Sequence, residues 1–481
     1  MNAEEVYARR VEELMDGIDK GEFSDIANPP QAYSYGHLAA LFYFAQVLQN
    51  GKKLYEQLYD RVISFGTYHV RKKVENGEKI KIAFLAISAA EWAVENVYRM
   101  LEKDERLECY VIVCPLMDRE RENREKTEEQ TWHFFKKHGY EARRVYDKEQ
   151  DVCQGWEAAG GMPDLVVHAT PWYHSLPEAF WIERFPLRVI NCYIPYGIYV
   201  ADSMDGNYAK KFIYNKEFVN MQWKVYADSA LNLSGYETYE LLHGKNITYS
   251  GYAKMDCFQE RRDYTKEELR SIWKFPQEAG SGEMKRLIIA PHYSLEASAL
   301  VQYATFAKNV YFWLYLAQKY QDKITFIFKP HPNLRWKAVE THLFPSYEEY
   351  DRYLEKWNTL PNARVAEEES YLDMFATSDG MIMDSGSFIG EYMYVDKPLL
   401  FLTREEQAFN SLGEHLISGY YHARGEDYIA IEQFVEQVIL KGDDAMQEKR
   451  HRVFHETLDY TGRNGCLASE YIVKDIQSLL E

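Results

Sequence analysis

The sequence predicts an α/β protein with two domains, each built around a parallel sheet. Short apolar segments such as 79–88 and 109–114 recur between helical patterns, and they lack the alternation of a half-exposed strand. Buried, non-alternating strands that alternate with helices are typical of parallel sheets covered on both faces. A charged, glycine-containing stretch at 264–282 separates two blocks of this kind. We therefore expect the domain boundary just before or within that stretch.

The composition is that of an ordinary globular protein, with 46% hydrophobic and 27% charged residues. A formal net charge of −19 argues against nucleic acid as a partner, because binding to phosphates needs a positive surface. The same charge weakens attraction to anionic lipid. A local basic patch would still allow peripheral association with the inner face of the cell membrane.

The sequence shows none of the signals that direct a chain into or across a membrane. The longest apolar run, 38–48, is shorter than the roughly 20 residues that span a bilayer. Acidic residues stand near the N-terminus, where a signal peptide would need its apolar core. The six cysteines have neither CxxC nor zinc-ligand spacing. We therefore expect a cytoplasmic protein with reduced cysteines and no transmembrane helix.

Residues 1–78 predict a helical N-terminal extension, because apolar residues recur there at helical spacing. Strands and helices then alternate over 79–262, which we take as the first α/β domain. In parallel sheets, the loops after the carboxyl ends of the strands line the ligand crevice. The candidate residues in such loops are His168, His174, Tyr196 and Asp202. Each of them, taken singly, is more often structural than catalytic.

The second α/β domain covers 263–464 in our prediction, and His292 ends its first strand. The motif KPHP follows a later strand and contains Lys329 and His331, which its prolines hold outside the helical region of backbone space. The turn presents a cation and an imidazole at the carboxyl end of a strand, and both can donate to anionic oxygens. Residues 465–481 predict a last helix that crosses back to the first domain.

The segment 378–402 combines a strand, a polar turn and the start of a helix. The turn consists of Asp384, Ser385, Gly386 and Ser387. A turn at a helix start offers unpaired N–H groups and the positive end of the helix dipole, which suit a phosphate or diphosphate. We expect Ser387 at the N-cap and Glu391 to accept hydrogen bonds from ribose hydroxyls. A plain helix cap between two strands explains the turn alone equally well.

We expect the predicted phosphate site to work without a metal. No DxD pair ends a strand in the second domain, whereas Lys329, His331 and the turn at 385–387 can neutralise phosphate charge themselves. The first strand lacks GxGxxG, so the fingerprint of a dinucleotide cofactor is absent and no cofactor is expected.

Together these motifs resemble the CDP-glycerol glycerophosphotransferase family, which includes polymerases and primases of teichoic-acid and capsule synthesis. The resemblance covers the chain from Lys79 to its end. It is carried, in chain order, by PDLVVHATPW, CYIPYGIY, YSGYAKMD, IIAPHYSL, FKPHPNL, MDSGSFIGEYMYVDKPLLFL and NGCLASEYIV. It implies a GT-B architecture of two facing Rossmann-like domains. The first would then be the acceptor side, and the second would bind the nucleotide donor.

The resemblance also implies an activity. A bacterial transferase of this family moves a polyol phosphate, glycerol phosphate above all, from a CDP-linked donor to a glycan or lipid-linked acceptor and releases CMP. His331 matches the diphosphate-contacting histidine, and Ser387 matches a turn serine. Asp384 and Glu391 match the acidic positions around that turn. Ribitol phosphate or a sugar as the transferred unit stays open, as do the acceptor and the number of transfers.

From their places at strand ends, we expect His292 to contact the same diphosphate as His331, with Lys329 as a weaker contributor. A plain packing role for His292 is equally open. Two differences from the family concern the remaining machinery. The WHGTPLK-like segment corresponds to IPYGIYV at 194–200, which lacks the histidine taken as general base. Gly386 stands where the family has a second serine. His168 then becomes the leading candidate for the general base on the acceptor hydroxyl, followed by Asp202.

Two alternatives remain. DSGSFIGEY and KPHPN also resemble the DSGG-x-QEE turn and the HPN motif of UDP-N-acetylglucosamine 2-epimerases, which share the GT-B fold. Against an epimerase, the chain is longer, the early TGTRPE-like segment is absent, and Tyr392 replaces the second consecutive glutamate. A non-catalytic glycan-assembly protein is the other alternative, and the missing histidine of the WHG segment supports it.

Overall fold

The computed structural model describes residues 2–20, 34–259, 262–276, 284–296, 301–366 and 370–481. Of Ser387 it describes the backbone but not the side chain. Part of the charged stretch at 264–282 thus lies outside the described residues. The chain divides into two compact units. Unit 1 comprises Met1–Gly197, Lys210–Asp256 and Tyr460–Glu481. Unit 2 comprises Ile198–Ala209 and Cys257–Asp459.

Unit 1 contains a seven-stranded parallel sheet in the order β3-β2-β1-β6-β7-β8-β9. Its strands are β1 Ile80–Ala86, β2 Leu107–Val113, β3 Ala142–Arg144, β6 Leu165–His168, β7 Ile190–Tyr193, β8 Lys224–Ala227 and β9 Ile247–Tyr249. The strand order reverses between β1 and β6, as in a Rossmann fold, and ligands of such sheets bind outside the carboxyl ends at that point. A small antiparallel ribbon joins β4 Tyr146–Asp147 to β5 Val152–Cys153.

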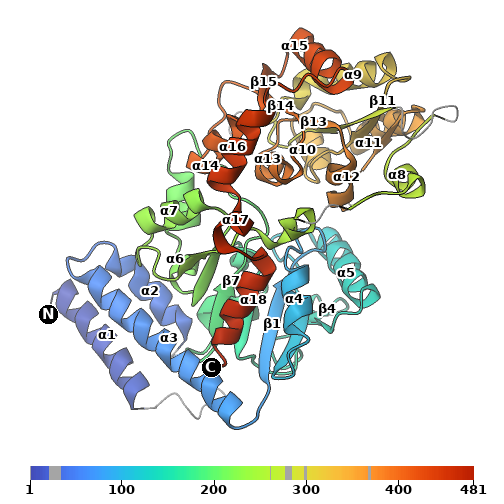
Figure 1. The fold of residues 1–481 in the computed structure, drawn as a ribbon. Coiled ribbons are helices and arrows are strands. Elements are labelled where there is room, and N and C mark those ends of the chain that lie inside the picture. Colours follow the sequence, from blue (N-terminus) through green and yellow to red (C-terminus); the bar gives the residue numbers. More distant parts are fainter. Residues whose placement is uncertain (1, 21–33, 260–261, 277–283, 297–300, 367–369) are drawn as a thin grey trace. The chain divides into compact units, whose positions relative to one another are not determined.

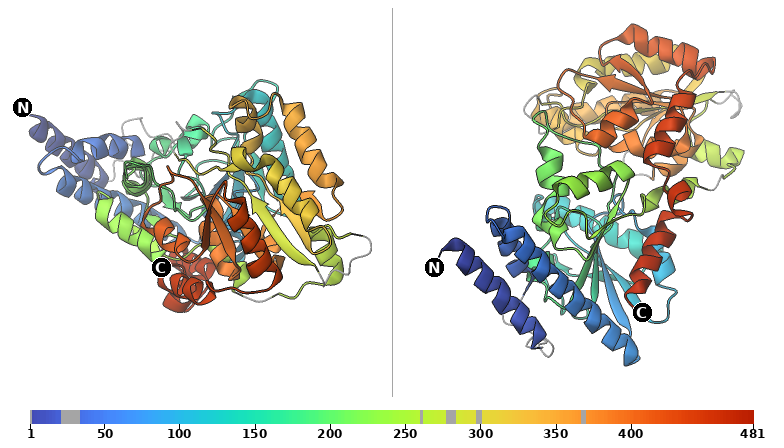
Figure 2. Two further views of the ribbon diagram at one scale, coloured as in Figure 1. Left: turned by 90° about the horizontal axis from the view of Figure 1, so that it is seen from above. Right: turned by 60° about the vertical axis from the view of Figure 1, so that its left-hand side comes forward.

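Helices cover both faces of this sheet (Figures 1 and 2). The helices of unit 1 are α1 Ala3–Asp19, α2 Tyr35–Ala45, α3 Gly51–Glu75, α4 Glu95–Leu101, α5 Arg121–Lys137, α6 Glu217–Asn220, α7 Ala230–Tyr239, α17 Tyr460–Asn464 and α18 Ala468–Ser478. Tyrosine hydroxyls fix α2 and α3 to unit 1: Tyr35 donates to the carbonyl of Val189 at 2.9 Å, and Tyr59 to that of Gln222 at 2.7 Å. The helical segment 1–78 is thus an integral part of unit 1.

The C-terminal segment returns to unit 1 through one buried carboxylate. Asp256 is 4% exposed and accepts hydrogen bonds from the backbone N–H groups of Ala468 and Ser469 at 3.0 and 2.9 Å. It also accepts from the hydroxyl of Tyr460. Asp256 therefore caps the first turn of α18, which packs against α4. The chain leaves unit 1 after Asp256 and re-enters it at Tyr460, earlier than the predicted boundaries at 262 and 464.

Unit 2 contains a six-stranded parallel sheet in the order β12-β11-β10-β13-β14-β15. Its strands are β10 Lys285–Ala290, β11 Ile324–Phe328, β12 Ala363–Val365, β13 Gly380–Met383, β14 Leu399–Thr403 and β15 Tyr421–Arg424. Its helices are α8 Lys266–Ile272, α9 Phe306–Lys319, α10 Leu334–Glu340, α11 Tyr347–Thr359, α12 Leu372–Thr377, α13 Ser387–Glu391, α14 Ser411–Ile417, α15 Tyr428–Gln433 and α16 Gln447–Thr457. The order reverses between β10 and β13, so both units have the Rossmann order.

The segment Ile198–Ala209 corrects the predicted domain boundaries, because it belongs to unit 2. The backbone N–H of Asn410 donates to the carbonyl of Val200 at 2.9 Å, and its side chain donates to that of Tyr199 at 2.8 Å. An antiparallel bridge joins Ala201 to Phe409. Asp202, expected in the first domain, is therefore a residue of unit 2.

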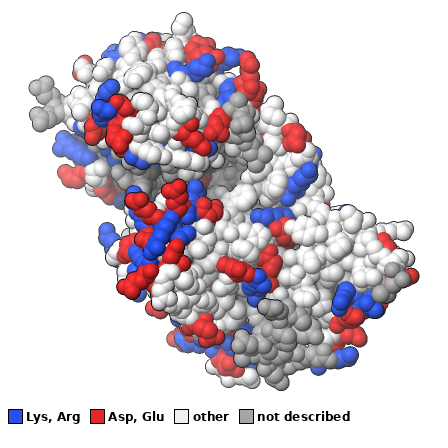
Figure 3. Space-filling model, turned by 180° about the vertical axis from the view of Figure 1, so that it is seen from behind, with Lys and Arg blue, Asp and Glu red and all other residues white. Residues whose placement is uncertain are grey.

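Acidic and basic side chains lie interspersed on the face of the molecule shown in Figure 3. Within the described residues, no helix has both the length and the apolar character needed to cross a bilayer.

Candidate functional site

The carboxyl ends of β10, β11 and β13 bring the predicted phosphate-binding residues together in unit 2. These strands are neighbours in the sheet, and the order reverses between β10 and β13. His292 follows β10, Lys329 and His331 follow β11, and the turn at 384–386 follows β13. Backbone hydrogen bonds run from Lys329 N to Ile289 O at 2.8 Å and from His331 N to Pro291 O at 3.1 Å, so the first two loops have one fixed geometry.

Asp384 holds this edge of the sheet together. Its side chain is 1% exposed and accepts hydrogen bonds from the backbone N–H of His292 at 2.6 Å and the hydroxyl of Thr305 at 2.8 Å. The backbone N–H of Thr305 donates to the same carboxylate. Burial raises the pKa of Asp384 to about 6, although these hydrogen bonds lower it. The carboxylate therefore positions the loops after β10 and β13 and the start of α9.

His292 is oriented by Ser294. The Ser294 hydroxyl accepts the backbone N–H of Tyr303 at 2.9 Å, so its own hydrogen is available for His292 Nδ1, which lies 2.8 Å away. The backbone N–H of Ser294 also donates to Nδ1, at 3.2 Å. Because Nδ1 is an acceptor, the network assigns the proton of the neutral ring to Nε2. His292 thus offers an N–H donor at Nε2.

His331 has the same tautomer for the same reason. The backbone N–H of Asn333 donates to His331 Nδ1 at 3.1 Å, which leaves the proton on Nε2. The two imidazole rings lie with their centroids 5.2 Å apart, and the ring of Tyr293 lies 4.4 Å from that of His331. The structure therefore pairs the imidazole ring of His292 with that of His331.

The electrostatics of the pair favour an anion. Burial, followed by the nearby charge of Lys329, lowers the pKa of His331 to about 4. Burial, followed by His331, lowers the pKa of His292 well below its usual value. Both rings are consequently neutral at pH 7, and each can donate one hydrogen bond from Nε2. Lys329, itself 7% exposed, adds a positive charge beside them. A diphosphate is a ligand of matching charge and hydrogen-bonding character.

The turn differs from the prediction in one residue. α13 begins at Ser387, so Gly386 is the N-cap and Ser387 is the first helical residue. The side chain of Ser387, predicted as a donor-binding group, lies outside the described residues. A Cβ at position 386 would lie 3.1 Å from the ring of Tyr303, which gives a packing reason for glycine there. α13 has only five residues, so its dipole is small and most of the positive charge comes from Lys329.

The structure places Ser385 and Glu391 in the interior of unit 2, at 4% and 3% exposure. Glu391 ends α13, and a contact to ribose stays a prediction. Its neighbour Tyr392 is fully buried, and its hydroxyl lies 2.7 Å from the hydroxyl of Ser378. Tyr392 therefore belongs to the core of unit 2.

His168 is the clearest correction among the predicted residues of unit 1. Its ring is 1% exposed and packs between Phe185 and Phe218, with centroid distances of 6.0 and 5.2 Å. Nε2 lies 3.2 Å from Asn191 Oδ1, and burial lowers the pKa of His168 to about 4. A ring enclosed by aromatic side chains cannot reach an acceptor hydroxyl. His168 is thus a core residue rather than a general base.

Asp202 and Tyr196 lie in different units. Asp202 accepts the backbone N–H groups of Ser203 and Ala209 at 2.8 and 3.2 Å and so closes a turn of unit 2, and its acceptor-side role stays a prediction. Tyr196, two residues beyond Ile194, stays at the carboxyl edge of the unit 1 sheet. The indole N–H of Trp172 donates to the Tyr196 hydroxyl at 3.3 Å.

Sequence reasoning missed Ser294 and Thr305, which orient His292 and Asp384. Ser294 stands two residues after His292, where a hydroxyl readily bonds back to the preceding loop, and this spacing was the available signal. Thr305 carries no such signal, because only the fold brings it to Asp384. Among the described residues, no group of three or more His, Cys, Asp or Glu side chains is arranged to hold a metal ion.

Comparisons by sequence do not identify a family. No family model matches the chain, and no curated protein sequence matches it significantly. Solved structures are similar in fold. A variant of the wall teichoic acid polymerase TagF superposes with a TM-score of 0.52 at 12% identity, over 92% of this chain and 97% of that one.

Two further structures have the same fold. One is MnaA of S. aureus with UDP, with a TM-score of 0.51, 14% identity, and coverage of 83% of this chain and 97% of that chain. The other is the UDP-GlcNAc 2-epimerase of Neisseria meningitidis bound to UDP-GlcNAc, with a TM-score of 0.50, 14% identity, and coverage of 83% and 100%. These likenesses and the two Rossmann-like sheets confirm the predicted α/β class and GT-B fold.

Proposed function

We propose that the protein is an enzyme of the CDP-glycerol glycerophosphotransferase type. It transfers a polyol phosphate, glycerol phosphate above all, from a CDP-linked donor to a glycan or lipid-linked acceptor of teichoic-acid or capsule synthesis. The observation that carries the proposal is the pair of Nε2–H donors of His292 and His331 beside Lys329, at the strand-order reversal of unit 2. The likeness to TagF over 92% of the chain agrees with it.

In the proposed reaction, an acceptor hydroxyl attacks the β-phosphorus of the donor. A bond forms between the acceptor oxygen and this phosphorus, and the bond from phosphorus to the bridging oxygen breaks. CMP leaves with that electron pair, and the acceptor proton passes to a base. Such a transfer needs mainly positioning and stabilisation of charge on the phosphate oxygens. His292, His331 and Lys329 supply these donors, and the N–H groups of the turn at 385–387 add to them.

The other residues of unit 2 have supporting tasks in this proposal. Asp384 does not contact the donor, because its oxygens are bonded to His292 N and to Thr305. It fixes the loop that carries His292. Glu391 binds the ribose hydroxyls of the nucleotide. The enzyme works on the cytoplasmic side and associates peripherally with the membrane when its acceptor is lipid-linked.

A UDP-N-acetylglucosamine 2-epimerase is the second candidate, because structures of that class match the fold equally well. The burial of Tyr392 argues against it, since this side chain occupies the place of a glutamate in the resembling motif and is bonded inside the core.

The proposal is tested by nucleotide binding and by CMP release. CDP-glycerol at a hundredfold over its dissociation constant should stabilise the folded protein by about 2.7 kcal/mol, whereas UDP-GlcNAc should not. A panel of CDP-linked donors should yield CMP, also in EDTA. His331→Ala should lower the turnover by about a hundredfold, because a donor to the reacting phosphate is lost.

The matched control is His451→Ala, which removes an exposed histidine of unit 2 that pairs with Asp396. It should leave the turnover unchanged. Stabilisation by UDP-GlcNAc instead would favour the epimerase, and no response to either nucleotide would favour an assembly protein. Near-normal CMP release by folded His331→Ala would refute the site itself.

A further inference from the structure

The segment Ile198–Ala209 of unit 2 is joined to a tyrosine beside the phosphate site. The segment is held to residues 408–410 by backbone hydrogen bonds. The carbonyl of Ala408 accepts the backbone N–H of Asp202 at 3.3 Å and the hydroxyl of Tyr303 at 2.8 Å. Burial raises the pKa of the Tyr303 hydroxyl, so this group remains a proton donor at neutral pH. One carbonyl oxygen therefore connects the segment with Tyr303.

Tyr303 in turn contacts the machinery that orients His292. Its ring stacks on Phe409 with centroids 5.0 Å apart, and Phe409 forms an antiparallel bridge with Ala201 of the segment. The same ring lies edge to face with His292, at 5.5 Å between centroids. The backbone N–H of Tyr303 donates at 2.9 Å to the hydroxyl of Ser294, which is bonded to His292 Nδ1. Tyr303 thus acts on His292 both through its ring and through its backbone.

Two glycines allow α13 to lie directly against the segment. A Cβ added at Gly386 would lie 3.1 Å from the ring of Tyr303 and 3.6 Å from Val200 Cγ2. A Cβ added at Gly390 would lie 2.8 and 2.9 Å from Cγ2 and Cδ1 of Ile198. A larger side chain at either position would therefore press the segment away from α13.

One asparagine fastens the segment and caps a helix at the same time. Asn410 is the N-cap of α14, and its side chain accepts the N–H of Gly413 at 2.9 Å. Its side-chain amide donates to the carbonyl of Tyr199 at 2.8 Å. A serine at position 410 would keep a capping oxygen, because serine is as good an N-cap as asparagine, but it would lose the amide donor. Asn410→Ser therefore loosens the segment while α14 stays capped.

We propose that Tyr303, held in place by the segment Ile198–Ala209, is a positioning residue that fixes His292 for a diphosphate. This inference rests on the phosphate site of the proposed function, but not on the identity of the nucleotide. While Tyr303 is held, Ser294 and His292 keep one arrangement, so the Nε2–H donor needs no reordering when the ligand binds. A bound diphosphate must in return stabilise the contacts of the segment, because coupled equilibria are reciprocal.

The test measures the Kd of the full chain for inorganic pyrophosphate and for CDP-glycerol by titration calorimetry. Asn410→Ser should raise both Kd values about tenfold, although the protein stays folded. Tyr303→Phe removes only the hydroxyl that reaches Ala408 and should raise both about fivefold. The double variant should bind at most about twofold more weakly than Asn410→Ser, because both substitutions act through the same ring.

A second pair of variants does not depend on Asn410. Gly390→Ala favours the helix but displaces Ile198, so it should weaken the binding of pyrophosphate. Adding Ile198→Ala should restore the binding, because it removes both carbon atoms that the new Cβ would meet first.

Amide hydrogen exchange supplies a readout that a purely structural role would not move. Pyrophosphate should slow the exchange of the Asp202 amide in the wild type, and this protection should be smaller in Asn410→Ser. Asn2→Ser is the matched control, because Asn2 caps α1 in the same way, with its Oδ1 2.9 Å from Glu5 N. It should leave both Kd values and the exchange of Asp202 unchanged.

Four results decide between this inference and the proposed function. An unchanged Kd for pyrophosphate in folded Asn410→Ser and Gly390→Ala would overturn the role of the segment. Additive effects in the double variant would overturn the role of Tyr303. Pyrophosphate binding that weakens as expected, without any binding of CDP-glycerol, would support the inference and contradict the proposed function. A wild-type protein that binds neither probe would refute both.

Discussion

His292 and His331 of unit 2 are buried as neutral rings, and their burial makes the fold less stable in acid. Each ring must gain a proton in the unfolded chain once the pH falls below about 6.5, whereas in the folded protein His331 stays neutral down to about pH 4. Because the pKa of His331 is lower in the folded protein than in the unfolded chain, the fold is most stable above about pH 6.5. Its free energy of unfolding decreases as the pH falls from about 6.5 toward 4.

We predict that His331→Gln weakens the acid sensitivity of the donor-free protein. Between about pH 6.5 and pH 5, the wild type should lose about 1–2 kcal/mol more unfolding free energy than the variant, because the variant has one buried titratable ring fewer. Thermal or urea unfolding at several pH values measures this difference. An equal acid loss in both proteins would show that His331 titrates alike in the folded and unfolded chains.

Individual residues also show how far the sequence could lead. The KPHP motif predicted a rigid turn with Lys329 and His331, because proline restricts the backbone locally, and the structure brings His331 to His292. The burial of His168 could not be predicted in this way. Phe185 and Phe218 enclose it, and the fold alone brings them to β6. The local geometry of a motif could be predicted from the sequence, whereas the solvent exposure of a side chain depended on distant parts of the chain.

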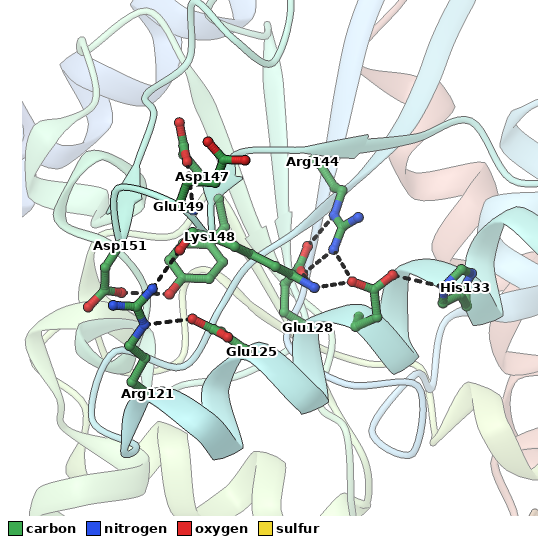
Figure 4. Close-up of polar contacts among 11 residues, drawn as sticks. Arg121, Glu125, Glu128, His133, Arg144, Asp147, Lys148, Glu149 and Asp151 are labelled. Atoms are coloured by element: carbon green, nitrogen blue, oxygen red, sulfur yellow. Dashed lines mark hydrogen bonds and ion pairs between the residues drawn. The ribbon is translucent and has the colours of Figure 1, made fainter.

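Among the elements, α5 is a charged helix whose acidic residues pair with side chains at β3 and just beyond it. Arg144 of β3 donates to both oxygens of Glu128 on α5 at 2.8 and 2.6 Å, and Lys148 pairs with Glu129 (Figure 4). Glu128 is 1% exposed. The close-up shows Arg144 and Lys148 pointing toward the side chains of α5. These pairs fasten α5 over the edge of the sheet at β3.

We predict that Arg144→Met destabilises unit 1 by about 3–5 kcal/mol, because it leaves the Glu128 carboxylate buried without its main partner. The double variant Glu128→Met, Arg144→Met should recover much of this loss, since apolar side chains can fill the same space. Unfolding in urea compares the single, double and parent proteins. Arg121→Gln, which removes an exposed partner of Glu125, serves as control and should leave the unfolding midpoint unchanged. Additive effects of the two substitutions would contradict the coupling.

At the scale of elements, the sequence was informative where strands are buried on both faces. The apolar runs predicted at 79–88 and 109–114 and within 378–402 form strands β1, β2 and β13, because continuous apolar runs are typical of strands inside a parallel sheet. The start of α13 was misplaced by one residue, since the Gly386 backbone already has helical angles.

The whole molecule is organised by a chain that crosses between its units four times. Unit 1 is built from three separate segments, and unit 2 is built from two, Ile198–Ala209 and Cys257–Asp459. The Rossmann order of both sheets follows from the alternation of strands and helices. The exchange of Ile198–Ala209 into unit 2 was not predictable, because its hydrogen bonds to residues 408–410 join positions about two hundred residues apart.

We predict that Asp256→Asn destabilises unit 1 by about 2 kcal/mol. An amide places a donor against the N–H of Ser469 or Ala468, and the helix cap of α18 loses its charge. Limited proteolysis should cut the variant near residues 460–467 faster than the wild type. Lys474→Gln, an exposed change on α18, is the control and should not alter cleavage. Equal cleavage of all three proteins would show that other contacts hold the segment.

The return of α18 has a consequence for synthesis on the ribosome. Ile472 and Ile476 of this helix are buried, and the helix packs against α4. During translation, the whole of unit 2 is synthesised before α18. The surface of α4 that α18 covers therefore remains exposed while the second sheet folds. A chain arrested after Asp459 would therefore contain the strands of both large sheets and still expose a hydrophobic surface that chaperones can bind. The packing of unit 1 is therefore completed only after α18 has been synthesised.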